Sequence, residues 1–169
     1  MNSTLSSSLF TPANLISGSW SFEGDGTCNT VVDKYHGFEL AKLPNATEAQ
    51  MEEAIAAAYA SRDVLKKMSA GERSAKLEAL AALIAKHEEE IAQLMVKEAG
   101  KPIGAARIEV ARSITTVRTA AAESLRFGGE VTPMDFGAGT GKTAFTKRFP
   151  IGVIAAITPF NFPLNLVLH

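Results

Sequence analysis

Apolar residues recur at helical spacing through the middle of the chain, with polar residues between them. This spacing gathers the apolar side chains on one face of a helix and predicts a set of amphipathic helices. The predicted helices cover residues 47–68, 69–100 and 103–127. The first two open with capping boxes, formed by Thr47 with Gln50 and by Ser69 with Glu72. The second helix is long, and we expect it to bend near His87.

Shorter apolar stretches flank the helices and predict strands. Before the helices, β-like pieces separated by glycines cover residues 15–16, 20–22, 30–32 and 38–43. After them, residues 130–149 alternate around a Gly-rich turn, which predicts a β-hairpin. Residues 153–157 form an uninterrupted apolar run between Gly152 and Pro159. Such a run fits a strand that is buried on both faces of a parallel sheet.

These elements together predict an α/β protein. Residues 1–129 would hold a β meander and the helices, residues 130–149 the hairpin, and residues 150–169 the first parallel strand and the segment that follows it. The strand has no predicted parallel neighbour in the chain. We therefore expect the fold of this chain to be incomplete or to depend on a partner.

Composition narrows the function classes. The 169 residues are 46% hydrophobic and 21% charged, with a formal net charge of −1, which is typical of a globular domain. This charge balance argues against nucleic acid or an anionic membrane as a partner, and no apolar stretch is long enough to span a bilayer. Residues 1–8 lack the pattern of a secretory signal. A single cysteine excludes an internal disulfide and indicates a cytoplasmic location.

The best candidate for chemistry is Asn161. In parallel α/β sheets, functional polar groups lie just past the carboxyl ends of the strands, and Asn161 follows the predicted strand at residues 153–157. Pro159 and Pro163 restrict the backbone on both sides of it. Taken alone, an asparagine at this point would also fit an Asx turn that satisfies its own backbone.

Residues 149–163, with the sequence Phe-Pro-Ile-Gly-Val-Ile-Ala-Ala-Ile-Thr-Pro-Phe-Asn-Phe-Pro, resemble the opening of the cofactor domain in the aldehyde dehydrogenase superfamily. The resemblance implies that the Asn161 amide donates a hydrogen bond to the oxyanion formed when a cysteine thiolate attacks an aldehyde. A neutral donor aimed in advance stabilises that charge without competing as an acid. The sequence of residues 160–165 resembles that of relatives that act on small polar or anionic aldehydes such as lactaldehyde.

The same resemblance implies a Rossmann-type cofactor domain, of which this chain is a truncated N-terminal portion. NAD or NADP would be the cofactor, and the backbone lying along it would be that of Ile157, Thr158, Pro159 and Phe160. The nucleophilic cysteine would follow His169, so we expect the chain alone to be inactive. The full-length form would be a homo-oligomer that uses the hairpin at its subunit interface. An inactive oligomerisation or docking module is the alternative.

Other candidates are weaker. Residues 137–143 end like a phosphate-binding P-loop, but Phe136 stands where the motif requires glycine, and a strand is predicted where it requires a helix. Cys28 has no basic neighbour in sequence to activate it. Glu109 and Arg112 are interpreted as scaffold residues that pair across one helical turn. No metal site is expected, because the histidines are scattered, at His36, His87 and His169.

Overall fold

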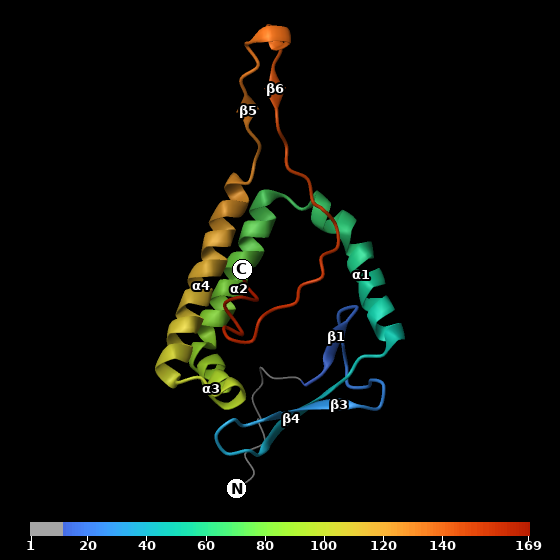
Figure 1. The fold of residues 1–169 in the computed structure, drawn as a ribbon, viewed down its shortest axis with the longest axis vertical. Helices are drawn as coiled ribbons and strands as arrows, with labels where there is room; N and C mark the ends of the chain where they lie inside the picture. The colour runs from blue at the N-terminus through green and yellow to red at the C-terminus, as the bar shows by residue number, and fades with distance from the viewer. Residues whose placement is uncertain (1–11) are drawn as a thin grey trace.

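The computed structural model describes residues 12–169 and confirms an α/β chain. The expectation that residues 1–8 carry no secretory signal therefore lies outside the described residues. A β meander comes first, a helical region follows, and a long hairpin and an irregular C-terminal segment complete the chain (Figure 1). Among the described residues, no helix combines the length and the apolar character that crossing a bilayer requires.

The strands form small antiparallel sheets, each made of two strands. β1 (Asn14–Ile16) pairs with β2 (Ser19–Ser21), and β3 (Cys28–Val32) pairs with β4 (Glu39–Pro44). Each pair joins strands that are neighbours in sequence, as the glycine-punctuated pattern predicts. Asn14 also donates a side-chain hydrogen bond of 3.1 Å to the carbonyl of Pro44, which links the two sheets.

The helices begin where the sequence places their caps. They are α1 (Glu48–Lys67), α2 (Ala70–Lys86), α3 (Glu88–Ala99) and α4 (Ile103–Arg126). Both predicted capping boxes are present, at Thr47 and at Ser69. The predicted long helix is two helices, because the backbone leaves helical geometry at His87 (φ −111°, ψ 20°). Acidic residues in the first turn of α3 favour a new helix start there, and Gly100 ends it in the left-handed conformation.

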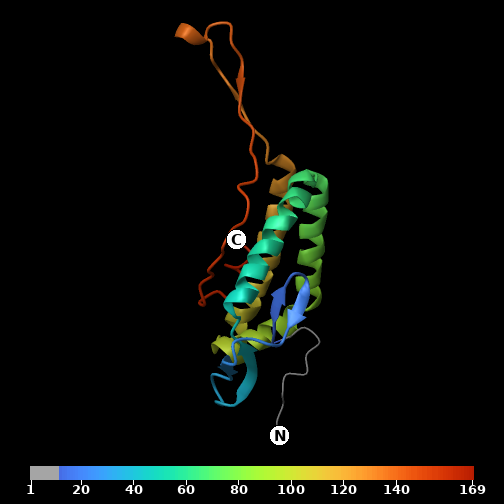
Figure 2. The same cartoon turned by 90° about the vertical axis from the view of Figure 1, so that its right-hand side faces the viewer.

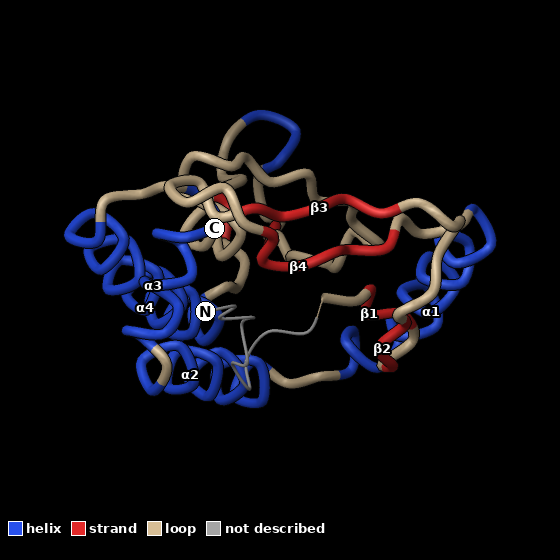
Figure 3. Tube along the Cα trace, turned by 90° about the horizontal axis from the view of Figure 1, so that it is seen from below, coloured by secondary structure: helices blue, strands red, loops and turns tan. Residues whose placement is uncertain are grey.

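The core lies between α2, α3 and α4, which stand together on one side of the molecule (Figure 3). Alanines at the helix contacts let the backbones approach closely, and larger side chains fill the space between them. The core residues are Ala81, Ile84, Ala92, Met95, Ala106, Val110, Ile114 and Val117. Helix α1 lies on the opposite side, next to β1 and β2, and has no buried residue.

The hairpin is an arm that projects away from the helices (Figure 2). Its paired parts are β5 (Val131–Thr132) and β6 (Ala144–Phe145), and a 3₁₀ turn, η1 (Gly137–Gly139), lies at the tip. Residues 137–143 are therefore the tip of a hairpin, and β6 follows them where a P-loop needs a helix. The structure thus contradicts a P-loop geometry for this segment.

The predicted strand at residues 153–157 is absent. Residues 150–159 carry no helix or strand, and their side chains are exposed. The reason is physical, since a parallel strand needs at least one neighbouring strand to pair with, and no described strand pairs with this segment. Residues 163–167 form a turn, and Leu164 and Leu168 pack on the core between the helices.

Candidate active site

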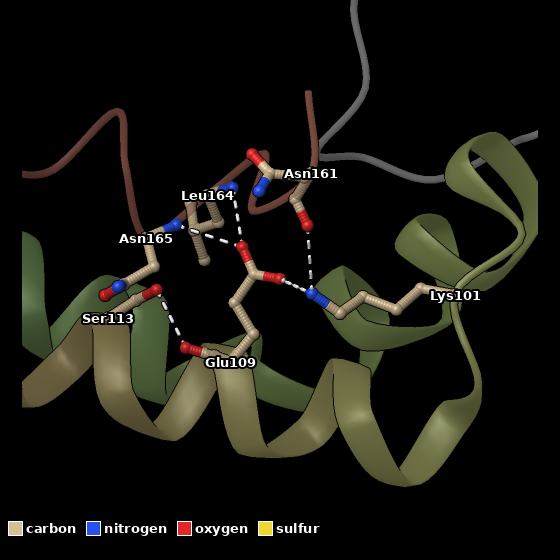
Figure 4. Close-up of polar contacts among 6 residues, drawn as sticks. All are labelled: Lys101, Glu109, Ser113, Asn161, Leu164 and Asn165. Carbon is tan, nitrogen blue, oxygen red and sulfur yellow. Dashed lines mark hydrogen bonds and ion pairs between the residues drawn. The ribbon is translucent and has the colours of Figure 1, made fainter. Parts of the chain in front are cut away.

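Asn161 lies in a bend just before that turn, and its side chain is exposed. Its main chain is held by the loop between α3 and α4, because Lys101 Nζ donates a hydrogen bond of 3.3 Å to the Asn161 carbonyl oxygen (Figure 4). Within residues 12–169, the side-chain amide of Asn161 has no hydrogen-bond partner. The described residues thus leave the amide open to an external group while Lys101 ties its backbone to the scaffold.

The organising group is the carboxylate of Glu109, on α4. One oxygen, Oε1, accepts hydrogen bonds from the backbone N–H groups of Leu164 (3.0 Å) and Asn165 (3.1 Å). The other, Oε2, accepts a hydrogen bond from Lys101 Nζ. The close-up shows the carboxylate between the ammonium and the turn (Figure 4). Glu109 therefore links the turn after Asn161 to the same lysine that holds the Asn161 carbonyl.

Glu109 is 1% exposed, so its charge needs compensation. Burial alone would raise the pKa of Glu109, but the hydrogen bond from Lys101 and those from the backbone of Asn165 and Leu164 lower it, and the net shift is downward. The carboxylate is therefore ionised at neutral pH. Its contribution to stability is complete above its ordinary pKa and is lost as the pH falls through the lowered value.

Two further contacts fix the residues around Asn161. Thr116 donates a side-chain hydrogen bond of 3.1 Å to Oδ1 of Asn165, whose side chain is buried. Lys101 Nζ lies 4.0 Å from the centre of the Phe162 ring, and the Arg112 guanidinium lies 6.0 Å from it on α4. The predicted pairing of Glu109 with Arg112 is wrong, because the buried carboxylate turns to Lys101 and Arg112 approaches an aromatic ring instead.

The predicted cofactor residues directly precede this held segment. Ile157, Thr158, Pro159 and Phe160 are exposed, with Ile157 at 99% and Phe160 at 91%. No other part of the described chain covers these four side chains. The structure thus presents an open segment leading into Asn161.

The remaining candidates have local roles. Cys28 is exposed on β3, where it pairs with Pro44 of β4. His36 and His87 contact Asp33 and Glu90, each three residues away in sequence. Between residues 12 and 169, no group of three or more His, Cys, Asp or Glu side chains is arranged to hold a metal ion.

The sequence predicted a role for Asn161, which stays a prediction, but Lys101 and Glu109 were not predicted as partners of its segment. A signal was present, because Glu109 lies on the buried face of α4, next to Val110 and one turn before Ser113. A carboxylate among core positions is almost never fully buried unless it is paired. That rule would have predicted a buried ion pair here.

Comparison with known proteins identifies the family. The sequence profile of the "Aldehyde dehydrogenase family" matches residues 20–169. The 3-sulfolactaldehyde dehydrogenase of Priestia megaterium is 38% identical over 156 residues, which cover 91% of this chain and 32% of that protein. The lactaldehyde dehydrogenase of Methanocaldococcus jannaschii is 38% identical over 139 residues, which cover 82% of this chain and 29% of that protein.

Solved structures give the same result. An aldehyde dehydrogenase from Physcomitrella patens, in complex with the reaction product succinate, is 40% identical with a TM-score of 0.84, covering 92% of this chain and 33% of that one. An NADP-dependent glyceraldehyde-3-phosphate dehydrogenase from Bacillus halodurans, complexed with NADP, is 33% identical with a TM-score of 0.85, at 92% and 33% coverage. The chain spans about a third of the length of these relatives. The resemblance seen in residues 149–163 is thereby confirmed, and the chain belongs to the aldehyde dehydrogenase family.

Proposed function

We propose that this chain supplies the oxyanion donor of an NAD(P)-dependent oxidoreductase that converts an aldehyde to a carboxylic acid. The observation that carries the proposal is the exposed Asn161 amide, without a partner among the described residues, on a backbone held by Lys101. The N–H groups of this amide are not engaged by the described residues, and the backbone that carries the amide is held in place. Those are the properties that oxyanion stabilisation requires.

The proposed chemistry begins with attack of a cysteine thiolate on the aldehyde carbon. A C–S bond forms, and the π electrons of the carbonyl move onto oxygen, giving a tetrahedral thiohemiacetal anion. The Nδ2–H of Asn161 donates a hydrogen bond to that oxygen, and the donor is neutral, so it stabilises the charge without giving up its proton.

The residues before Asn161 fit a bound NAD or NADP. Ile157 and Phe160 leave an apolar edge open, and Pro159 removes one backbone donor beside them. The backbone of residues 157–160 would lie along the cofactor. When bound, the cofactor supplies the acceptor for the hydride that leaves the aldehyde carbon, and it is present in the NADP complex of the Bacillus halodurans relative.

The substrate class follows from the relatives. Their names specify lactaldehyde and 3-sulfolactaldehyde, and the Physcomitrella patens structure contains succinate as product. These compounds are small and carry a hydroxyl, a sulfonate or a second carboxylate in addition to the reacting group. We therefore assign this chain a small polar or anionic aldehyde as the substrate of the complete enzyme.

The nucleophile of this proposal lies outside the chain. Cys28 is the only cysteine in the sequence, and it belongs to the β3–β4 sheet, whereas Asn161 is held at the α3–α4 loop. The purified 169-residue chain is therefore expected to show no NAD(P)-linked aldehyde oxidation. Turnover by that chain, abolished by Cys28→Ser, would contradict this part of the proposal.

The test uses a hybrid enzyme in which residues 1–169 are followed by the remaining part of the Priestia megaterium relative. Asn161→Ala should lower kcat by about 10²- to 10³-fold, the loss typical of one oxyanion donor. Asn161→Asp keeps the size but places a negative charge at the oxyanion, so it should be no more active. Val167→Ala, at an exposed position of the same segment, is the matched control and should keep wild-type kcat. A folded hybrid that binds NADP but oxidises no aldehyde, or an unchanged kcat in Asn161→Ala, refutes the proposal.

A second candidate role is oligomerisation through the hairpin, favoured by one observation. The arm exposes large apolar side chains on both of its strands and at its tip, including Val131, Phe136 and Phe145. An isolated two-stranded hairpin is marginal in water and leaves both edges unpaired. Phe145→Ser should therefore shift the hybrid enzyme toward monomer in light scattering, and Lys142→Ser at the tip should not. Equal masses for the two variants would exclude this role for the arm.

A further inference from the structure

The segment that carries Asn161 is fastened by one buried ion pair at several points. Lys101 Nζ donates to the Asn161 carbonyl at 3.3 Å, and Glu109 accepts from the backbone N–H groups of Leu164 and Asn165. The lysine and the glutamate are bonded to each other. The pair therefore holds the main chain at Asn161 and again three and four residues later.

Residues 12–169 give the side chain of Asn161 no comparable support. Its amide is exposed and has no hydrogen-bond partner among residues 12–169. The direction of the amide therefore depends on its backbone, and the contacts that fix this backbone are those of Lys101 and Glu109. Phe162 adds to the same restraint, because its ring lies 4.0 Å from Lys101 Nζ.

Supporting a surface turn with this ion pair costs desolvation free energy. Glu109 is almost fully buried and the Lys101 side chain is 14% exposed, so both charges lose most of their hydration. Buried ion pairs often stabilise a fold no better than apolar residues of the same volume. What the pair offers, and an apolar contact does not, is a directional hold on chosen backbone atoms.

We propose that Lys101 and Glu109 are positioning residues that aim the Asn161 amide at the oxyanion of the reaction. This inference rests on the proposed function of Asn161. Lys101 fixes the peptide carbonyl of Asn161, and Glu109 fixes the turn that follows Pro163. Neither side chain is assigned a contact with substrate or cofactor, so both act through Asn161.

The first test asks whether the pair holds the backbone, and it needs only the 169-residue chain. Glu109→Gln places an NH₂ group opposite the Lys101 ammonium and removes the charge from the two backbone bonds. Amide hydrogen exchange at Leu164 and Asn165 should then accelerate about 5- to 10-fold, the difference between a hydrogen bond to a charged group and one to a neutral group. Ser113→Ala, one turn along α4 and also buried, is the control and should leave these two amides protected. Unchanged exchange in Glu109→Gln overturns the proposal.

The second test asks whether the hold reaches the chemistry, and it uses the hybrid enzyme. Lys101→Met keeps the length of the side chain and removes the donor to the Asn161 carbonyl. It should lower kcat about 10- to 100-fold, as a misplacement of roughly 1 Å does, with little change in KM. The same substitution in the Asn161→Ala background should change kcat less than about twofold, because residues that act as a unit are not additive. Lys101→Arg, which keeps a cationic donor, should recover part of the loss.

The outcomes separate the two proposals. An equal loss of kcat from Lys101→Met with and without Asn161 would show that the pair only stabilises the fold, and would overturn the positioning role. An unchanged kcat in Asn161→Ala would instead refute the oxyanion assignment. The exchange experiment would still report whether the pair holds the turn.

Discussion

Val117 provides a quantitative test of the core between α2 and α4. Its side chain is 2% exposed, it belongs to the core cluster, and it lies two turns from Glu109. Val117→Ala removes two carbon atoms from this core. Each buried carbon removed costs about 0.5–1.5 kcal/mol, so the loss is about 1–3 kcal/mol. Alanine is the better helix former by ~0.7 kcal/mol, which leaves a net loss of about 0.3–2.3 kcal/mol.

The matched control is Val64→Ala on α1. Val64 is 67% exposed, so the same substitution removes little buried surface and gains the same helix propensity. Urea unfolding followed by helical circular dichroism gives both free energies, and equal slopes would show that the comparison is valid. Val117→Ala should lower the midpoint, and Val64→Ala should leave it unchanged or raise it. Equal midpoints would refute the placement of the core between α2 and α4.

Three other features lead to measurable expectations. Thr47→Ala removes the capping box of α1 and should cost about 0.5–2 kcal/mol locally, seen as faster amide exchange in α1, whereas unchanged exchange would contradict the cap. The hydrogen bond from Arg107 lowers the pKa of Glu89 to about 2, so the stability from this pair should be lost as the pH falls from about 4.5 toward that value. Glu89→Gln should flatten this acid limb of the unfolding curve, and a limb of the same slope would exclude the pair as its cause. Gly129→Ala would place a Cβ 1.7 Å from the carbonyl oxygen of Thr146, on the opposite side of the hairpin. It should open the base of the hairpin in nuclear magnetic resonance spectra, and Gly128→Ala, with 3.9 Å to its nearest atom, should not.

Local signals predicted the helices well, because capping and helical periodicity are properties of neighbouring residues. Thr47 and Ser69 cap helices where the sequence places them, and Gly100 ends α3. The break at His87 was predicted as a bend, and the structure shows a change of helix. The strand at residues 153–157 failed because its apolar run specifies burial, and the described chain supplies no neighbouring strand.

In the candidate site too, local features were predicted and long-range contacts were not. Asn161 was predicted from its flanking prolines and the family resemblance, which are both contained in one short segment. Lys101 and Glu109 escaped prediction because their partners lie 55–60 residues further along the chain. Periodicity places Glu109 on the apolar face of α4, but only the folded chain shows which backbone atoms its carboxylate meets.

Those long sequence separations also set an order of assembly. The helices α2, α3 and α4 follow one another in sequence, and the α2–α4 ion pair between Glu78 and Arg118 spans 40 residues. The bonds to Asn161 and to the turn span 49–60 residues. Contacts between residues close in sequence generally form earlier, because less loop entropy opposes them. We therefore expect the helices to collapse first and the segment around Asn161 to dock on them in a later kinetic phase. The Glu109 carboxylate would then lack its backbone hydrogen bonds until the segment docks. Slow docking would delay the formation of the donor site without delaying the packing of the helices.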